Sequence, residues 1–140
     1  MTTKTKTRAG ESLTPMLAAF HSITDRSLQA VWQVYAESSL EKLILDFGQK
    51  SLVVVADEND DSIDISVEDT TGLRSGGIVN GSHREPWNNL LGKRFGWGWM
   101  TVNQQGYCDG LLLSFDGIVP QVLLNVIASS IKVGAITGIA

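Results

Sequence analysis

The acidic loop that begins at Asp57 places oxygen ligands at the spacing of a calcium-binding loop. Asp57, Asn59, Asp61 and Glu68 fall at the first, third, fifth and twelfth positions of such a loop, where carboxylate and amide oxygens coordinate Ca²⁺. However, Ser62 stands where an EF-hand has glycine, and both flanks have the composition of strands. A solvated acidic hairpin turn explains the run as well, because Asp and Asn side chains bond nearby backbone N–H groups. We expect the hairpin, with a calcium-stabilised module or a basic protein partner as alternatives.

Residues suited to nucleophilic or acid–base catalysis are few. Cys108 is the only cysteine and starts an apolar strand, where a buried thiol acts as a small hydrophobe. The two histidines have no partner at ligand spacing, so we predict no metal site, no cofactor and no catalytic residue. The alternative is a ligand-binding or enzymatic cleft, in which a carboxylate beside an apolar wall has a raised pKa and acts as a base. Its candidate residues are Asp109, Asp116, Arg94 and His83, although nothing in their spacing brings them together.

Tryptophan, glycine and amide residues are concentrated between positions 96 and 109. Trp97 and Trp99 share one face of a strand by alternation, and Gly96 and Gly98 leave the opposite face flat. Such a pair of rings can stack a ligand or anchor a partner. Alternatively, the tryptophans fill the core and the glycines admit a crossing element, which is the arrangement we expect. Uncharged hydrogen-bonding groups follow at the end of the strand, where binding loops often lie. The candidate binding surface consists of Trp97, Trp99, Asn103, Gln104, Gln105, Tyr107 and Asp109.

The same region carries a recognisable order of residues. It contains Trp97-x-Trp99, the run NQQGY at 103–107, Asp109-Gly110 and Ser114-Phe115, followed by Pro120 and the segment 129–133. This order resembles an uncharacterised family of small bacterial proteins, which is known only as a domain of unknown function. The resemblance covers about Leu28 to Thr137 and leaves the segment from Met1 to Asp25 outside. It implies no activity.

Alternating apolar and polar residues predict about eight strands. The expected strands are 28–37, 42–47, 52–56, 62–67, 95–102, 108–115, 122–128 and 131–137. The first of these also fits helical spacing, but its valine and aromatic content favours a strand. Long helices do not alternate with the strands, so we expect antiparallel pairing. The predicted fold class is α+β, mainly antiparallel β, with a curled sheet or sandwich and one or two short helices.

Two segments have helical signals, and two others lack regular periodicity. Residues 15–20 follow Thr14 as a cap and begin with proline, which suits the first turn of a helix. Residues 87–91 could form one helical turn. The glycine-rich stretch 70–86 reads as a long connection, and 103–107 as a turn with Gly106 at a positive φ. We expect residues 1–12 to be a disordered tail and 13–140 to form a single mainly-β domain.

Composition narrows the classes of function. The chain has 140 residues, is 43% hydrophobic, and carries 15 acidic against 11 basic residues, which gives a net charge of −4. These values are typical of one globular domain and argue against a nucleic-acid partner. The apolar stretch 118–140 is interrupted by polar residues, so no membrane span is expected. A single cysteine fits a reducing compartment, the cytoplasm. We therefore predict a non-enzymatic cytoplasmic binding or regulatory module that acts through protein–protein contacts with an unknown partner, and a homo-oligomer is plausible.

Overall fold

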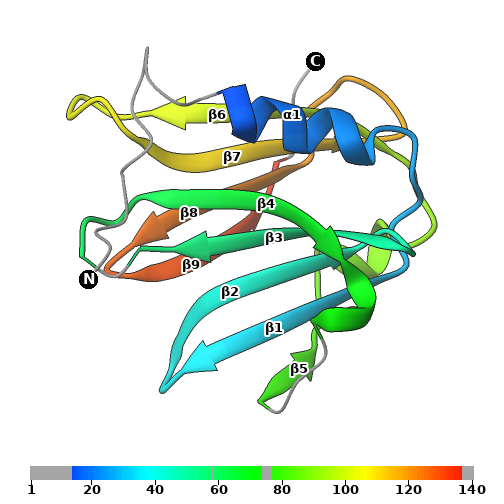
Figure 1. Cartoon of the computed structure of the whole chain (residues 1–140), viewed down its shortest axis with the longest axis horizontal. Helices are drawn as coiled ribbons and strands as arrows, with labels where there is room; N and C mark the ends of the chain where they lie inside the picture. Colours follow the sequence, from blue (N-terminus) through cyan, green and yellow to red (C-terminus); the bar gives the residue numbers. More distant parts are fainter. Residues whose placement is uncertain (1–13, 58, 74–76, 137–140) are drawn as a thin grey trace.

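The computed structural model describes residues 14–57, 59–73 and 77–136. These residues form two antiparallel sheets that pack face to face as a sandwich (Figure 1). A five-stranded sheet has the order β4-β3-β2-β1-β5, and a four-stranded sheet has the order β6-β7-β8-β9. The predicted α+β class with mainly antiparallel strands is therefore confirmed. The tail predicted for residues 1–12 lies outside the described residues.

Most strands lie close to their predicted positions. The five-stranded sheet contains β1 (Ala30–Ala36), β2 (Ser39–Asp46), β3 (Lys50–Ala56), β4 (Ile63–Asp69) and β5 (Ile78–Asn80). The four-stranded sheet contains β6 (Phe95–Val102), β7 (Cys108–Phe115), β8 (Val122–Ile127) and β9 (Ser130–Ala135). The helical elements are α1 (Thr14–Ile23) and the short 3₁₀ turns η1 (Thr70–Gly72) and η2 (Trp87–Asn89).

The glycine-rich connection contains the one described strand that we did not predict. β5 has three residues and pairs with β1 through Asn80, Val79 and Ile78. A strand of this length is too short to show alternation, so the sequence pattern cannot reveal it. The apolar stretch near the C-terminus forms the β8–β9 hairpin, as predicted. Within the described part of the chain, every helix is too short or too polar to cross a membrane.

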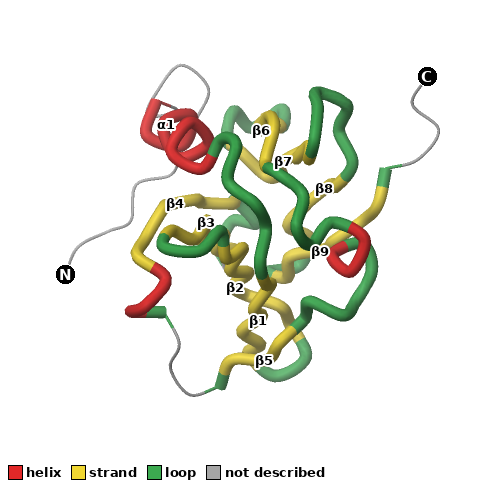
Figure 2. Tube along the Cα trace, turned by 90° about the vertical axis from the view of Figure 1, so that its right-hand side faces the viewer, coloured by secondary structure: helices red, strands yellow, loops and turns green. Residues whose placement is uncertain are grey.

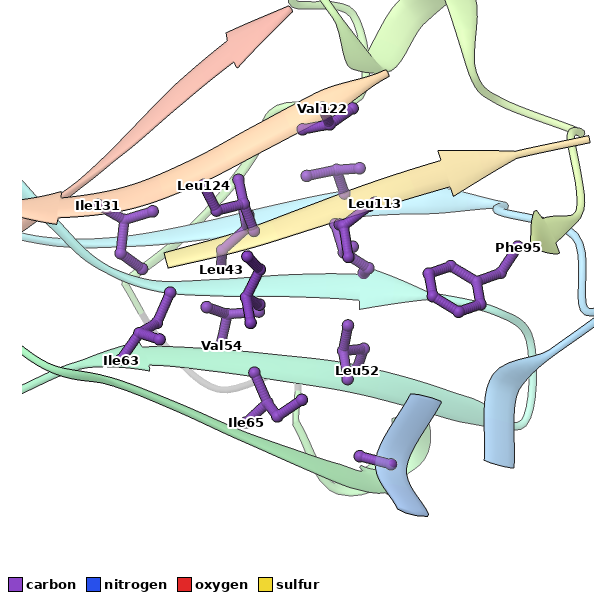
Figure 3. Close-up of a cluster of buried hydrophobic side chains, with 14 of the residues drawn as sticks. Leu43, Leu52, Val54, Ile63, Ile65, Phe95, Leu113, Val122, Leu124 and Ile131 are labelled. Carbon is purple, nitrogen blue, oxygen red and sulfur yellow. The ribbon is translucent and has the colours of Figure 1, made fainter. Parts of the chain in front are cut away.

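The hydrophobic core lies between the two sheets. Figure 3 shows inward-pointing side chains of the five-stranded sheet opposite those of the other sheet. The strands β3, β4 and β8 each contribute every second residue to this core, as a half-buried strand requires. The buried residues labelled there are Leu43, Leu52, Val54, Ile63 and Ile65 from one sheet, and Phe95, Leu113, Val122, Leu124 and Ile131 from the other.

The two open edges of the sandwich are closed by different elements. At the first, which we call the α1 edge, the helix packs against β3, β4 and β6 (Figure 2). The second edge, which we call the η2 edge, is closed by the segment between β5 and β6. This segment leaves β1 after a hydrogen bond in which the Gly81 N–H donates to the Val31 carbonyl at 2.9 Å. It returns where the Gly92 N–H donates to the Leu28 carbonyl at 2.7 Å. Trp87 of this segment is buried in the core.

Candidate functional site

β6 carries two tryptophans on the outer face of its sheet. Trp97 is 57% exposed and Trp99 is half-buried. Their ring centroids lie 6.1 Å apart with an angle of 32° between the planes. The prediction that the two rings share a face is therefore confirmed. The expectation that they fill the core is wrong.

A β-bulge is the physical reason for the outward direction of the tryptophans. Phe95 pairs with Phe115 while Gly98 pairs with Leu113, so three steps along β6 match two along β7. One extra residue turns the following side chains to the opposite face of the sheet. The buried Ser114 hydroxyl holds this arrangement, because it accepts from the Trp97 N–H at 2.8 Å and donates to a turn carbonyl at 2.7 Å. Without the bulge, alternation from the buried Phe95 would place both tryptophans inside.

The glycines of β6 allow other elements to approach the strand closely, as expected. A Cβ atom on Gly98 would overlap the ring of Phe20 from α1. A Cβ atom on Gly96 would overlap the carbonyl oxygen of Gly117. The Phe20 ring also stacks on Phe95 with centroids 5.9 Å apart. Glycine at position 98 therefore lets α1 dock on β6.

An elongated cavity lies between α1 and the start of β6. Its volume is about 350 Å³, which is within the size range of ligand pockets. The lining is mainly apolar, and we call this cavity the aromatic groove. It is lined by Leu17, Phe20, His21, Thr24, Gly96, Trp97 and Gly98.

The contribution of α1 to the groove was missed from the sequence. The helix buries Met16, Ala19, Phe20 and Ile23 against the sheets, which leaves Leu17 outside that stripe and 44% exposed. The helical spacing alone could have shown that Leu17 lies off the buried face. Helical spacing could not have shown that the face with Leu17 borders Trp97.

The remaining predicted surface residues continue along the β6–β7 hairpin to its turn. The Asn103 N–H donates to the Tyr107 carbonyl at 3.1 Å, and Gly106 has a φ of 88°, as the predicted turn requires. Gln104 and Gln105 are exposed at the tip. Six residue-to-residue steps along the extended strand lead from Trp97 to Asn103 at the turn, which corresponds to roughly 20 Å. The predicted residues therefore form an elongated strip, which we call the β6 strip, rather than a compact patch.

An apolar row crosses the sheet from the β6 strip. Trp99 lies opposite Leu112, and Leu112 lies opposite Leu123 on the next strand. Leu112 is half-buried, and Leu123 is 36% exposed. Cross-strand neighbours on one face contact each other, so the row widens the aromatic surface.

The four residues of the predicted cleft are not brought together. Asp109 accepts from the Thr101 hydroxyl at 2.8 Å near the start of β7. Asp116 follows the other end of β7, roughly 20 Å away along an extended strand, and accepts from the Arg94 backbone N–H at 2.8 Å. His83 is exposed in the segment after β5, which belongs to the other sheet. These four residues therefore do not line one cleft of ligand size.

The Asp57 loop has the predicted hairpin form and connects β3 to β4. The described carboxylates Asp57, Asp60 and Asp61 each bind backbone N–H groups. Asp57 accepts from the Asn59 N–H at 2.9 Å. Asp61 turns away and accepts from the N–H groups of Ser129 at 2.7 Å and Ala128 at 3.3 Å. Among the described residues, no group of three His, Cys, Asp or Glu side chains could hold a metal ion.

Comparison with known protein families places the chain in a family. The sequence model of a family of unknown function, DUF6334, covers residues 14–140. The chain belongs to DUF6334. The expectation from the β6–β9 motifs that the chain belongs to a family of unknown function is thus confirmed. The match to DUF6334 begins earlier than the expected Leu28, so it includes α1 and with it one wall of the aromatic groove. No curated protein and no solved structure matches the chain.

The thiol of this DUF6334 member is placed for packing rather than for nucleophilic attack. Cys108 is fully buried at the start of β7, and its Sγ donates to the Gly110 carbonyl at 3.3 Å. Burial raises the pKa of the Cys108 thiol to about 11. The thiolate, which is the nucleophilic form, is therefore scarce near neutral pH. What the site offers instead is ring stacking, apolar contact and amide hydrogen bonds.

Proposed function

We propose that this protein is a non-enzymatic cytoplasmic binding or regulatory module that holds a protein partner along the β6 strip. The observation that carries the proposal is the exposure of Trp97, 57% in a strand whose neighbouring positions are packed. Tryptophan is among the residues most enriched at the energetic centres of protein interfaces. Here the ring is already ordered against Trp99, so little conformational entropy is lost on binding.

The geometry favours an extended segment of the partner with one apolar anchor. β6 is an edge strand of its sheet, and edge strands accept additional strands through backbone hydrogen bonds. The backbone of Phe95 already bonds to the chain at Asp25 and Arg26, so the partner would pair beyond it. An apolar side chain of the partner would enter the aromatic groove between Leu17 and Trp97. The exposed amides of Gln104 and Gln105 would bind polar groups at the far end.

Site-specific photo-crosslinking tests this proposal in the cells that make the protein. A photoreactive phenylalanine derivative replaces Trp97 in one variant and Val79 in a control variant. Val79 is also a large exposed side chain, at 45%, but it lies on β5 in the other sheet. We expect one protein adduct from position 97 that position 79 does not give. Adducts that are the same at both positions would contradict the proposal.

Affinity for the identified partner provides the quantitative test. Trp97→Ala should weaken binding by at least about tenfold, because removing a central aromatic anchor typically costs more than about 1.4 kcal/mol. Val79→Ala should leave the dissociation constant unchanged. An adduct between two copies of the chain would identify the occupant as a second copy, and sedimentation of the Trp97→Ala variant should then show a shift towards monomer. Equal affinities of the two variants would argue against the strip as the interface.

A further inference from the structure

A second cavity, at the η2 edge, has a different chemical character from the aromatic groove. Its volume is about 290 Å³, and it lies between β1, β9 and the residues around η2. Most of its lining is polar, above a floor that includes the buried Trp87. The polar side chains that line it are Gln33, Tyr35, Ser38, Arg84, Glu85, Ser130 and Lys132.

Gln33 is a buried amide that faces this cavity. Its residue is only 4% exposed, and it points inward from β1 beside Gly81, where a Cβ atom would overlap the amide. Among the described residues its side chain has one hydrogen bond, in which Oε1 accepts from the Tyr35 hydroxyl at 3.5 Å. Buried amides are normally fully hydrogen-bonded, because an unpaired one costs free energy. The amide nitrogen is therefore an available donor that lines the cavity.

Ser130 supplies a second donor from the opposite sheet. Its residue is 7% exposed, and its Oγ accepts from the Leu40 N–H at 3.2 Å. A hydroxyl group that accepts in this way still has its own proton to donate. Gln33 and Ser130 thus present donors to the cavity from β1 and β9.

The rim of the cavity has a net charge of +1. Arg84 and Lys132 are cationic, Glu85 is anionic, and all three are exposed. The Arg84 guanidinium donates to the Tyr35 hydroxyl oxygen at 3.4 Å, which holds the cation beside the cavity. A cationic rim in a chain with a net charge of −4 favours a negatively charged ligand at this one place.

We propose that the η2 cavity binds a small organic acid with one carboxylate and a neighbouring hydroxyl group. The carboxylate lies at the rim between Arg84 and Lys132, where charge-assisted hydrogen bonds are strongest. The hydroxyl oxygen accepts from Gln33 and Ser130 inside. A single negative charge matches the rim, whereas a phosphate monoester carries about −1.5 to −2 at neutral pH. The cavity volume, at the lower end of the range for ligand pockets, suits a small molecule.

An NMR titration of the full chain with glycolate tests this inference. Glycolate is the smallest probe that has a carboxylate and an adjacent hydroxyl. We expect a saturable shift of the Gln33 side-chain amide signal with glycolate. Acetate, which lacks the hydroxyl, and inorganic phosphate should each bind about tenfold more weakly, which is the effect of losing one hydrogen bond to a charged or buried group.

Variants at the rim complete the test. Arg84→Gln and Lys132→Gln alter exposed side chains, so the fold should be retained, and each should raise the dissociation constant of glycolate about tenfold. Lys50→Gln removes a cation at the start of β3 and should leave it unchanged. Trp97→Ala should also leave it unchanged, which separates this site from the β6 strip. The inference is overturned by a non-saturable shift, by equal affinities of the Arg84→Gln and Lys50→Gln variants, or by phosphate or acetate binding as tightly as glycolate.

Discussion

The α1 edge and the η2 edge close the same sandwich but leave cavities of opposite character. A helix satisfies its own backbone hydrogen bonds, so α1 can place apolar side chains against β6 and leave an aromatic groove. The segment around η2 is irregular, and its backbone groups need side-chain partners. The Ser82 N–H donates to the Asn80 side chain at 2.9 Å, and Ser82 in turn accepts from the Val31 N–H at 2.8 Å.

This difference shows how the closing element determines the chemistry of a sheet edge. A regular element brings mainly apolar walls, and the candidate partner surface lies there. An irregular element brings polar side chains with it, and the buried amide of Gln33 lies there. Each edge nevertheless depends on a fully buried aromatic residue of its own. This residue is Phe95 at the α1 edge and Trp87 at the η2 edge.

The largest expected effect comes from removing either enclosed aromatic residue. Phe95 is 0% exposed and contacts the rings of Phe20, Phe47 and Phe115, while Trp87 is 1% exposed. Phe95→Ala and Trp87→Ala should each lower the free energy of unfolding by about 3–5 kcal/mol, because each leaves a cavity in the core. Urea denaturation measures this quantity. A small loss at only one edge would show that the two edges do not depend equally on their aromatic residue.

Gly98→Val should separate the α1 edge from the rest of the fold. The new side chain would occupy the place of the Phe20 ring, so overpacking should cost up to about 3 kcal/mol. Gly134→Ala is the matched control, because a Cβ atom on this β9 glycine meets nothing within 4 Å. Its free energy of unfolding should stay within about 1 kcal/mol of the parent. Equal stabilities of the two variants would mean that α1 does not dock closely on β6.

The titration of Cys108 reports on the core between the edges. The pKa of this thiol rises from 9.0 to about 11 on folding, so the folded state holds the proton in a range where the unfolded state loses it. The contribution of this thiol to the free energy of unfolding should therefore be constant well below pH 9 and fall between about pH 9 and pH 11, by about 2 kcal/mol. Cys108→Ala should remove this part of the pH dependence. Identical pH profiles of parent and variant would contradict the burial of the thiol.

Trp97→Ala should have the smallest effect on stability. More than half of this side chain is already in contact with solvent, and exposed substitutions usually change the free energy of unfolding by less than about 0.5 kcal/mol. Thermal unfolding monitored by circular dichroism measures the change. A loss above 2 kcal/mol would assign Trp97 to the fold rather than to binding.

Local patterns in the sequence were enough to predict most of the fold. Alternation located the strands around the core, and Gly106 marked the β6–β7 turn. The outward direction of Trp97 was not predictable, because the bulge depends on pairing with β7 and on the Ser114 hydroxyl. The η2 cavity was missed for a similar reason. Gln33, Arg84 and Lys132 come from three distant parts of the chain, and only the packing of β9 against the five-stranded sheet brings them together.

The extra residue at the start of β6 shifts the alternation of side chains by one position. Side chains after the bulge therefore point to the opposite face of the sheet from the one that strict alternation would give them. The number of residues between Phe95 and Gly98 thus decides which side chains reach this surface, as much as the residue types do. Deleting Gly96 would remove this extra residue, so strict alternation from the buried Phe95 would still place Trp97 and Trp99 on the outer face. The aromatic surface should therefore survive the loss of the bulge residue, whereas a register in which all residues are kept and the bulge is lost would bury both indoles.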